Sequence, residues 1–226
     1  MVQKSVSSDT RGGEAAADDA TPRKRGRPRA YQPEVAIGKA LDVFRKDGYA
    51  ATSLDDLSAA TGMNRPSLYG AFGDKRELYI KSYQRYRADA RKAIVAVFRT
   101  PMPLRTRLQR VYELALQIYL SGEGGPTGCF TVMTAASDAI ADADIRAIVQ
   151  DAVRELDTAF AASFQTAIDT GELPRIADPH ALAALASATL HTLSVRARAR
   201  MPRADLEALI AGAIDVLCGP ARTSSK

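Results

Sequence analysis

The chain lacks the residues that staple, anchor or export a protein. Among its 226 residues are only two cysteines, Cys129 and Cys218, with neither the number nor the spacing of a disulfide framework or a zinc site. No apolar run reaches the ~18 residues that a membrane span requires, and the polar N-terminus has no apolar segment typical of a secretory signal. We therefore expect a protein of the reducing cytosol that binds neither a metal nor a membrane.

Signs of catalysis are missing as well. The sequence has two histidines, no glycine-rich phosphate-binding loop, and no nucleophile accompanied by a recognisable general base. Alternating apolar patterns of the strand type and internal repeats are also absent. These absences argue against an enzyme and against a cofactor. They favour a helical protein, in keeping with 6% aromatic beside 46% hydrophobic residues.

Positive charge is concentrated in one short segment. The net charge is +5, yet residues 1–22 are net acidic, whereas residues 23–29 contain five basic side chains and no acidic one. Residues 1–22 have no apolar periodicity, so we expect a disordered tail there. The basic arm over residues 23–32 has the composition expected for local contact with nucleic acid.

The centre of this arm reads Arg25-Gly26-Arg27-Pro28 and resembles an AT-hook. The narrow minor groove of A·T-rich DNA has an enhanced negative potential, and a thin backbone of Arg, Gly and Pro fits into it. This interpretation makes Arg25, Arg27 and Arg29 DNA contacts. The alternative is a solvated basic tail that adds only non-specific attraction.

The segment that follows the arm has the start and stop signals of three short helices. Apolar residues recur at helical spacing from Ile37 to Phe44. Glycines then supply stops, and short polar side chains supply N-terminal caps. These signals are Gly48, Ser53 with Asp56, Gly62 and Asn64, and they predict helices over residues 33–46, 54–61 and 65–72.

The last two of these helices form a helix-turn-helix, in which the second helix enters the DNA major groove. Spacing alone is a weak signal, but the side chains of this stretch add much more. The segment resembles the DNA-binding domain of the TetR family of repressors, which implies a three-helix DNA-binding domain over residues 33–80. The resemblance rests on Phe44, Gly48, Tyr49, Thr52, Leu57, Ala60, Gly62, Leu68, Tyr69, Phe72, Lys75 and Leu78.

The predicted recognition helix, residues 65–72, has an inner and an outer face. Leu68 and Phe72 are four residues apart and should face the domain core, whereas Arg65 can pair with guanine O6 and N7. The resemblance implies phosphate contacts by Tyr69, by Lys75 and by Thr52, alone or with Ser53. A packed aromatic is the alternative for Tyr69. The candidate DNA-binding residues of the domain are Thr52, Ser53, Arg65, Pro66, Ser67, Tyr69 and Lys75.

Apolar periodicity predicts six further helices, so the chain is expected to be all-α with about nine helices. The resemblance assigns residues 81–220 to a larger effector-binding and dimerisation domain, followed by a tail over residues 221–226. The six helices are predicted over residues 75–99, 104–119, 129–140, 145–171, 178–200 and 206–217.

The last two predicted helices are rich in alanine and carry continuous apolar stripes. In the resembled family this pair of helices packs against the same pair of a second copy in a four-helix bundle. The two DNA-binding domains of the dimer, here called the heads, then bind a palindrome. The alternative is that both stripes pack inside a single chain. The candidate interface residues are Leu182, Leu185, Leu190, Leu193, Leu206, Leu209, Ile210, Ala213, Ile214 and Leu217.

The resemblance also implies an effector pocket among the central helices. Each candidate there has the alternative of an ordinary core residue. Cys129 follows Gly128 at a predicted helix start, in a segment similar to that of family members that sense electrophiles or oxidants; a small buried cysteine is the alternative. The candidate pocket residues are Tyr112, Tyr119, Cys129, Phe130, Met133, Phe160, Phe164 and His191.

The resemblance implies a dimeric repressor that leaves a palindromic operator in double-stranded DNA when a small-molecule or redox effector binds or reacts. The sequence does not identify that effector. An architectural protein that coats A·T-rich DNA with its basic arm is the alternative, and its binding would depend little on Arg65.

Overall fold

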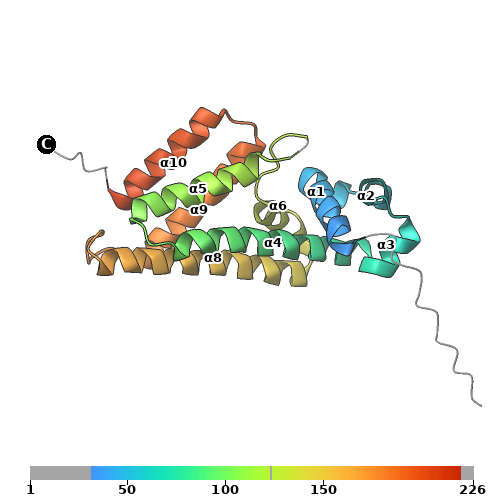
Figure 1. The fold of residues 1–226 in the computed structure, drawn as a ribbon, viewed down its shortest axis with the longest axis horizontal. Helices are drawn as coiled ribbons and strands as arrows, with labels where there is room; N and C mark the ends of the chain where they lie inside the picture. The colour runs from blue at the N-terminus through green and yellow to red at the C-terminus, as the bar shows by residue number, and fades with distance from the viewer. Residues whose placement is uncertain (1–31, 123, 220–226) are drawn as a thin grey trace, which may run out of the picture. The chain divides into compact units, whose positions relative to one another are not determined.

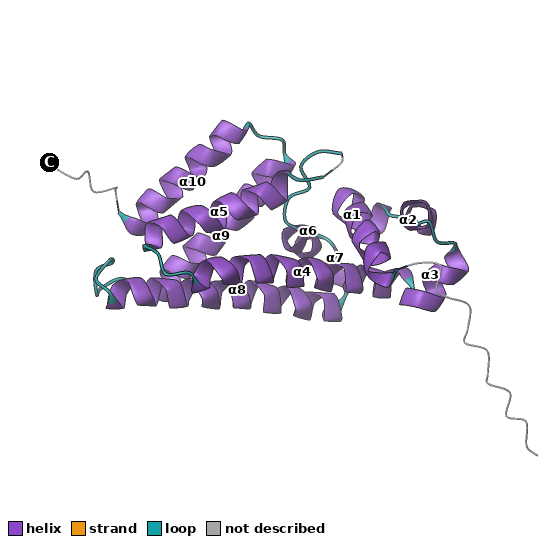
Figure 2. Ribbon diagram, in the orientation of Figure 1, coloured by secondary structure: helices purple, strands orange, loops and turns teal. Residues whose placement is uncertain are grey.

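The computed structural model describes residues 32–122 and 124–219, and these ranges contain ten α-helices and no strand (Figure 1). Figure 2 shows the described segments as helices joined by short loops, which confirms the predicted all-α class. The helices are α1 (Pro33–Ala51), α2 (Leu54–Thr61), α3 (Arg65–Phe72), α4 (Lys75–Arg99), α5 (Leu104–Leu120), α6 (Phe130–Ala136), α7 (Asp138–Ala141), α8 (Ala143–Asp169), α9 (Pro179–Arg198) and α10 (Arg203–Cys218).

Some of the sequence predictions fall outside the described residues. They are the tail over residues 1–22, the basic arm with Arg25, Arg27 and Arg29, and the tail over residues 221–226. In the part of the chain that is described, no helix is both long enough and apolar enough to cross a membrane.

The predicted caps around α2 and α3 are confirmed. Gly48 has φ +81° and ψ 170°, a conformation that interrupts the helical path of α1 and that residues with a Cβ adopt at a cost. Ser53 and Asp56 form a capping box at the start of α2, and Gly62 ends α2 in the left-handed region. The side chain of Asn64 caps α3. The turn between α2 and α3 therefore contains the residue that ends α2, Gly62, and the residue that caps α3, Asn64.

The first core of the molecule lies under the helix-turn-helix. Phe44, Leu57 and Leu68 are at most 2% exposed. The same cluster continues into α4, α6 and α8, because the ring of Tyr79 packs edge-on against Phe44 at 5.0 Å and against Phe130 at 5.3 Å between centroids. Apolar packing therefore continues across residue 80, where the sequence predicts a domain boundary. The boundary itself stays a prediction.

The second core lies among α5, α8, α9 and α10. Helix α8 packs against both α4 and α9, and α5 packs against α9 and α10. Figure 1 shows α4 and α8 side by side. Tyr112, Phe160 and Phe164 are fully buried here, and the Tyr112 hydroxyl donates to the Ala186 carbonyl at 3.2 Å.

Two sequence predictions require correction. The single helix predicted over residues 129–140 is two short helices, α6 and α7, because the backbone of Ser137 leaves the helical region at φ −121° and ψ −66°. Most of the predicted interface residues lie inside one chain, since their side chains complete the second core. These buried residues are Leu190, Leu193, Leu206, Ile210, Ile214 and Leu217, each at most 4% exposed.

Candidate nucleic-acid interface and effector cavity

The recognition helix α3 presents a polar outer face. Leu68 and Phe72 are buried at 2% and 4% exposure, as predicted from their spacing. The ring of Tyr69 is 49% exposed rather than packed in the core. Arg65, Pro66 and Ser67 are exposed with it, and α3 therefore offers four adjacent side chains to a DNA groove.

Helix α3 is fixed at both ends by side chains. At its start the side-chain oxygen of Asn64 accepts a hydrogen bond from the Ser67 amide at 2.9 Å. At its end the Lys81 ammonium of α4 donates to the carbonyl oxygen of Phe72 at 2.9 Å. The helix is only two turns long, and such short helices are marginal without external support. These contacts present its outer face in one orientation.

The Arg65 guanidinium is paired with a carboxylate of α2. Its Nε donates to Asp55 Oδ1 at 3.0 Å, and its Nη2 donates to Asp55 Oδ2 at 2.7 Å. Hydrogen bonding to Asp55 raises the pKa of Arg65, so the guanidinium stays charged. The sequence did not reveal this partner, because ten residues and a turn separate the two side chains.

The predicted phosphate contact of Thr52 is wrong for its side chain. Thr52 is 2% exposed, and its hydroxyl donates to the Gly48 carbonyl at 2.6 Å. Ser53 is exposed, but its hydroxyl is used in the capping box, where it also lowers the pKa of Asp56. The Lys75 ammonium lies 4.4 Å from the centroid of the Tyr49 ring, a cation–π contact at the start of α4.

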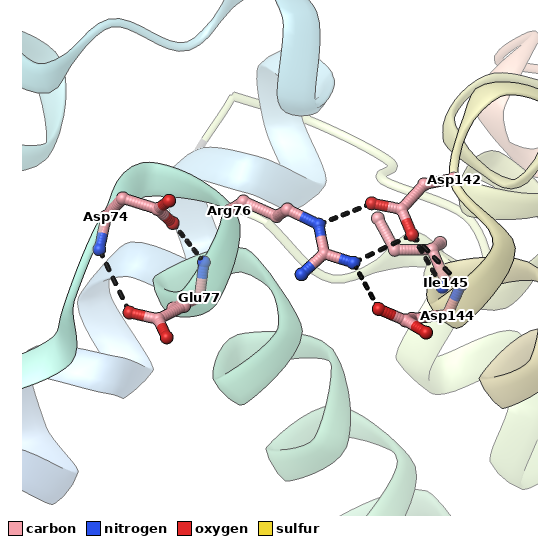
Figure 3. Close-up of polar contacts among 6 residues, drawn as sticks. All are labelled: Asp74, Arg76, Glu77, Asp142, Asp144 and Ile145. Carbon is pink, nitrogen blue, oxygen red and sulfur yellow. Dashed lines mark hydrogen bonds and ion pairs between the residues drawn. The ribbon is translucent and has the colours of Figure 1, made fainter.

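An ion-pair cluster joins the start of α4 to the start of α8 (Figure 3). Arg76 extends from α4 and donates through Nη2 to Asp142 at 2.8 Å and to Asp144 at 2.7 Å. Asp142 also accepts from the Ile145 amide and so caps α8. Hydrogen bonding to Arg76 holds the pKa of Asp142 well below its usual value. Helix α8 is thereby tied to the helix that follows α3.

A cavity of about 150 Å³ lies between α4, α5, α8 and α9. Its wall is largely apolar, with small side chains such as Ala115, Ala152 and Ala159. Of the predicted pocket residues, Tyr119, Cys129 and His191 line it.

The other predicted pocket residues do not line this cavity. Tyr112, Phe130, Phe160 and Phe164 are at most 1% exposed and fill the two cores. Met133 lies instead in a separate surface groove beside Gly48 and Arg198. These four aromatic side chains fill space in the cores, where packing is dense.

Polar groups gather at one side of the cavity. The Tyr86 hydroxyl donates to Cys129 Sγ at 3.5 Å, and burial raises the pKa values of Tyr86 and Tyr119, so both phenols stay neutral. Burial lowers the pKa of His191, which favours the neutral imidazole at pH 7. The wall therefore offers a thiol and neutral hydrogen-bonding groups, and it also includes Arg87, which pairs with Glu155 at 2.8 Å. No cluster of His, Cys, Asp or Glu suited to a metal occurs within the described ranges.

Exposed apolar side chains lie on α9 and α10, and one of them, Val195, also lines the surface groove that contains Met133. Leu185 and Val195 of α9 are 54% and 57% exposed, and Val216 of α10 is 78% exposed. Small side chains at helical spacing are also exposed on α9, namely Ala181, Ala184 and Ala188. We call this exposed surface the α9–α10 face. Exposed apolar surface of this kind is typical of interfaces.

Two protein-family models match this chain. The model described as bacterial regulatory proteins, tetR family, matches residues 37–81. The model described as tetracyclin repressor-like, C-terminal domain, matches residues 99–212, about half of the chain.

Individual proteins are similar to this chain as well. The uncharacterized HTH-type transcriptional regulator YezE of Bacillus subtilis (strain 168) is 24% identical over 148 residues, 66% of this chain and 76% of that protein. The HTH-type transcriptional repressor BdcR of Escherichia coli (strain K12) is 34% identical over 107 residues, but these cover only 47% of this chain and 54% of the repressor.

Solved structures share the fold. A cysteine mutant of the TetR family transcriptional regulator CifR, complexed with 26-base-pair operator DNA, matches with a TM-score of 0.76 and 28% identity over 84% of this chain and 98% of that one. The reduced form of NemR from E. coli matches with a TM-score of 0.72 at 18% identity, which bears on the fold alone. Given its helix-turn-helix and the matches to both family models, this chain belongs to the TetR family and is a DNA-binding transcriptional regulator.

Proposed function

We propose that this protein is a dimeric repressor that binds a palindromic operator and leaves it when a small molecule or an oxidant acts at the cavity. The observation that carries the proposal is the outer face of α3, where Arg65, Pro66, Ser67 and Tyr69 are exposed on a helix capped at both ends. The operator complex of CifR and the repressor BdcR support it as similar proteins.

The α9–α10 face supports the dimer. A single two-turn helix reaches few base pairs, so specific binding in helix-turn-helix proteins usually requires two heads related by a two-fold axis. The exposed apolar side chains Leu185, Val195 and Val216 are suited to a self-complementary contact. Of the predicted interface residues, Leu185 is exposed and Leu182, Leu209 and Ala213 are half-buried; these four remain candidates.

The cavity supports regulation by an effector. Its walls include α4, which starts beside α3, and α8, which the Arg76 cluster ties to α4. An effector that prefers the conformation in which the spacing of the two DNA-binding domains does not fit the operator lowers operator affinity. The coupling free energy is typically about 1–3 kcal/mol. The coupling is reciprocal, so operator DNA must weaken effector binding by the same factor.

Arg65→Ala tests the reading of DNA by α3. We expect this change to weaken operator binding by about 1–3 kcal/mol and to relax preference at one base position, because a bidentate guanine contact is lost. The measurement is fluorescence anisotropy on an operator selected from random DNA and on its single-base variants. Arg154→Ala, which removes an arginine of α8 that is also exposed and also paired with an aspartate, is the matched control. Unchanged site preference after Arg65→Ala would favour architectural binding by the basic arm instead.

Cys129→Ser tests the redox form of the effector. We expect a thiol-reactive compound to release the wild-type protein from its operator, with affinity about 5- to 150-fold lower, and to leave Cys129→Ser bound. The half-buried Cys218 provides the control, since Cys218→Ser should respond like wild type. Release that persists in Cys129→Ser would remove the thiol from the mechanism and leave reversible ligand binding.

A further inference from the structure

The Asp55–Arg65 ion pair is in an unexpected place for a stabilising contact. Its side chains are 75% and 55% exposed, respectively, and exposed ion pairs contribute little to stability. On the proposed DNA-facing surface the carboxylate of Asp55 also repels phosphates. Stability and general DNA affinity therefore give little reason for a carboxylate at this position.

The geometry of the pair suggests what the carboxylate does. Asp55 accepts from Nε and from Nη2, the two donors on one edge of the guanidinium. A guanidinium has five N–H donors in a rigid fork, so Nη1 and the second hydrogen of Nη2 stay available on the other edge. Two parallel donors are what guanine O6 and N7 require. The ion pair thus leaves the reading edge of Arg65 free.

The pair also limits the motion of a flexible side chain. Arg65 is the first residue of α3, and Asp55 lies in the first turn of α2, where a negative charge is favoured by the helix dipole. The capping box of Ser53 and Asp56 fixes that turn. An arginine side chain has many rotamers, and a partner fixed to another helix removes part of that freedom before DNA binds.

We propose that Asp55 is a positioning residue for sequence recognition: it holds the Arg65 guanidinium so that its free edge meets a single guanine. The inference rests on the proposed function, in which α3 reads the operator. It adds a specificity determinant from α2, outside the recognition helix. The carboxylate lowers affinity for DNA in general and raises discrimination at one base pair.

The experiment uses the full chain and an operator selected from random DNA. Affinities of wild type, Asp55→Ala, Asp55→Asn, Arg65→Ala and the Asp55→Ala/Arg65→Ala double variant are measured for the operator, its single-base variants and an unrelated duplex. We expect Asp55→Ala to reduce discrimination by about 3- to 30-fold at the position that Arg65→Ala relaxes, while affinity for the unrelated duplex stays equal or increases. The double variant should discriminate no worse than Arg65→Ala alone.

The controls are Asp151→Ala and Arg154→Ala, which break an exposed ion pair of α8 with the same changes of charge, and they should leave discrimination unchanged. If Asp55→Ala binds the operator more tightly and keeps full discrimination at that position, Asp55 is only a repulsive charge and the inference is wrong. A protein that selects no preferred sequence would instead refute the proposed function, so the two failures are distinguishable.

Discussion

Leu185→Glu should produce a folded monomer that binds a palindromic operator about 100- to 10,000-fold more weakly than the wild type. Leu185 is 54% exposed on the α9–α10 face, so a charge there does not disturb the core of the chain. At a dimer interface the same charge would be buried without a partner, which is strongly unfavourable. Without the second head, the operator loses the gain that comes from linking two half-site contacts, typically 10²–10⁴.

The dimer prediction is checked by sedimentation equilibrium for mass and by fluorescence anisotropy on full-site and half-site duplexes. Ile176→Glu is the matched control, because Ile176 is 95% exposed in the connection between α8 and α9 and outside the α9–α10 face. The control should remain a dimer with full affinity. A Leu185→Glu protein that remains a dimer would place the interface elsewhere, and a monomer with full operator affinity would refute the dimeric reading of DNA.

The extents of α2 and α3 could be predicted because local chemistry determines them, whereas α1, predicted over residues 33–46, continues past Gly48 to Ala51. Ser53 and Gly62 bracket α2, and Asn64 begins α3, so both helices start and end at the predicted residues. The break at Ser137 was missed, since the residues around it contain neither glycine nor proline. A helix can end there because tertiary packing outweighs local propensity.

The faces of α9 could not be assigned from the apolar stripe. Apolar residues occupy both sides of this helix, with Leu190 and Leu193 buried and Leu185 and Val195 exposed. Apolar residues on both sides of a helix do not say which side meets the rest of its own chain. The structure supplies that distinction, and it moves the candidate interface to the other side of the helix.

The candidate site was predictable only where neighbours in sequence are neighbours in space. The outer face of α3 follows from helical spacing, so the exposed side chains of Arg65, Pro66, Ser67 and Tyr69 were identified. The partners of Arg65 and Arg76 were not, because Asp55 and Asp142 are brought to them by turns and by tertiary packing. The cavity was predicted only in part: Tyr119, Cys129 and His191 line it, whereas the other large side chains that the sequence interpretation selected fill the cores or lie elsewhere.

Phe130→Ala is expected to lower the free energy of unfolding by about 3–5 kcal/mol. Phe130 is 1% exposed, and its ring lies 5.3, 5.7 and 5.8 Å from the rings of Tyr79, Tyr83 and Tyr86. Removal of the ring leaves a void that three tyrosines of α4 cannot fill without moving. Urea unfolding followed by circular dichroism gives the change. Phe130→Leu, which keeps much of the volume, should lose only about 1 kcal/mol.

The effect of Phe130→Ala should reach the DNA-binding surface, because the same row of rings leads there. Tyr79 packs against both Phe130 and Phe44, and Phe44 lies at the centre of the helix-turn-helix core. At temperatures where the variant is still folded, we therefore expect weaker operator binding as well. Met133→Ala, a change in the same helix but in the surface groove, should alter neither quantity. If Phe130→Ala lost less than about 1 kcal/mol and changed only the response to an effector, Phe130 would be a cavity residue after all, and the two cores would not be joined through it.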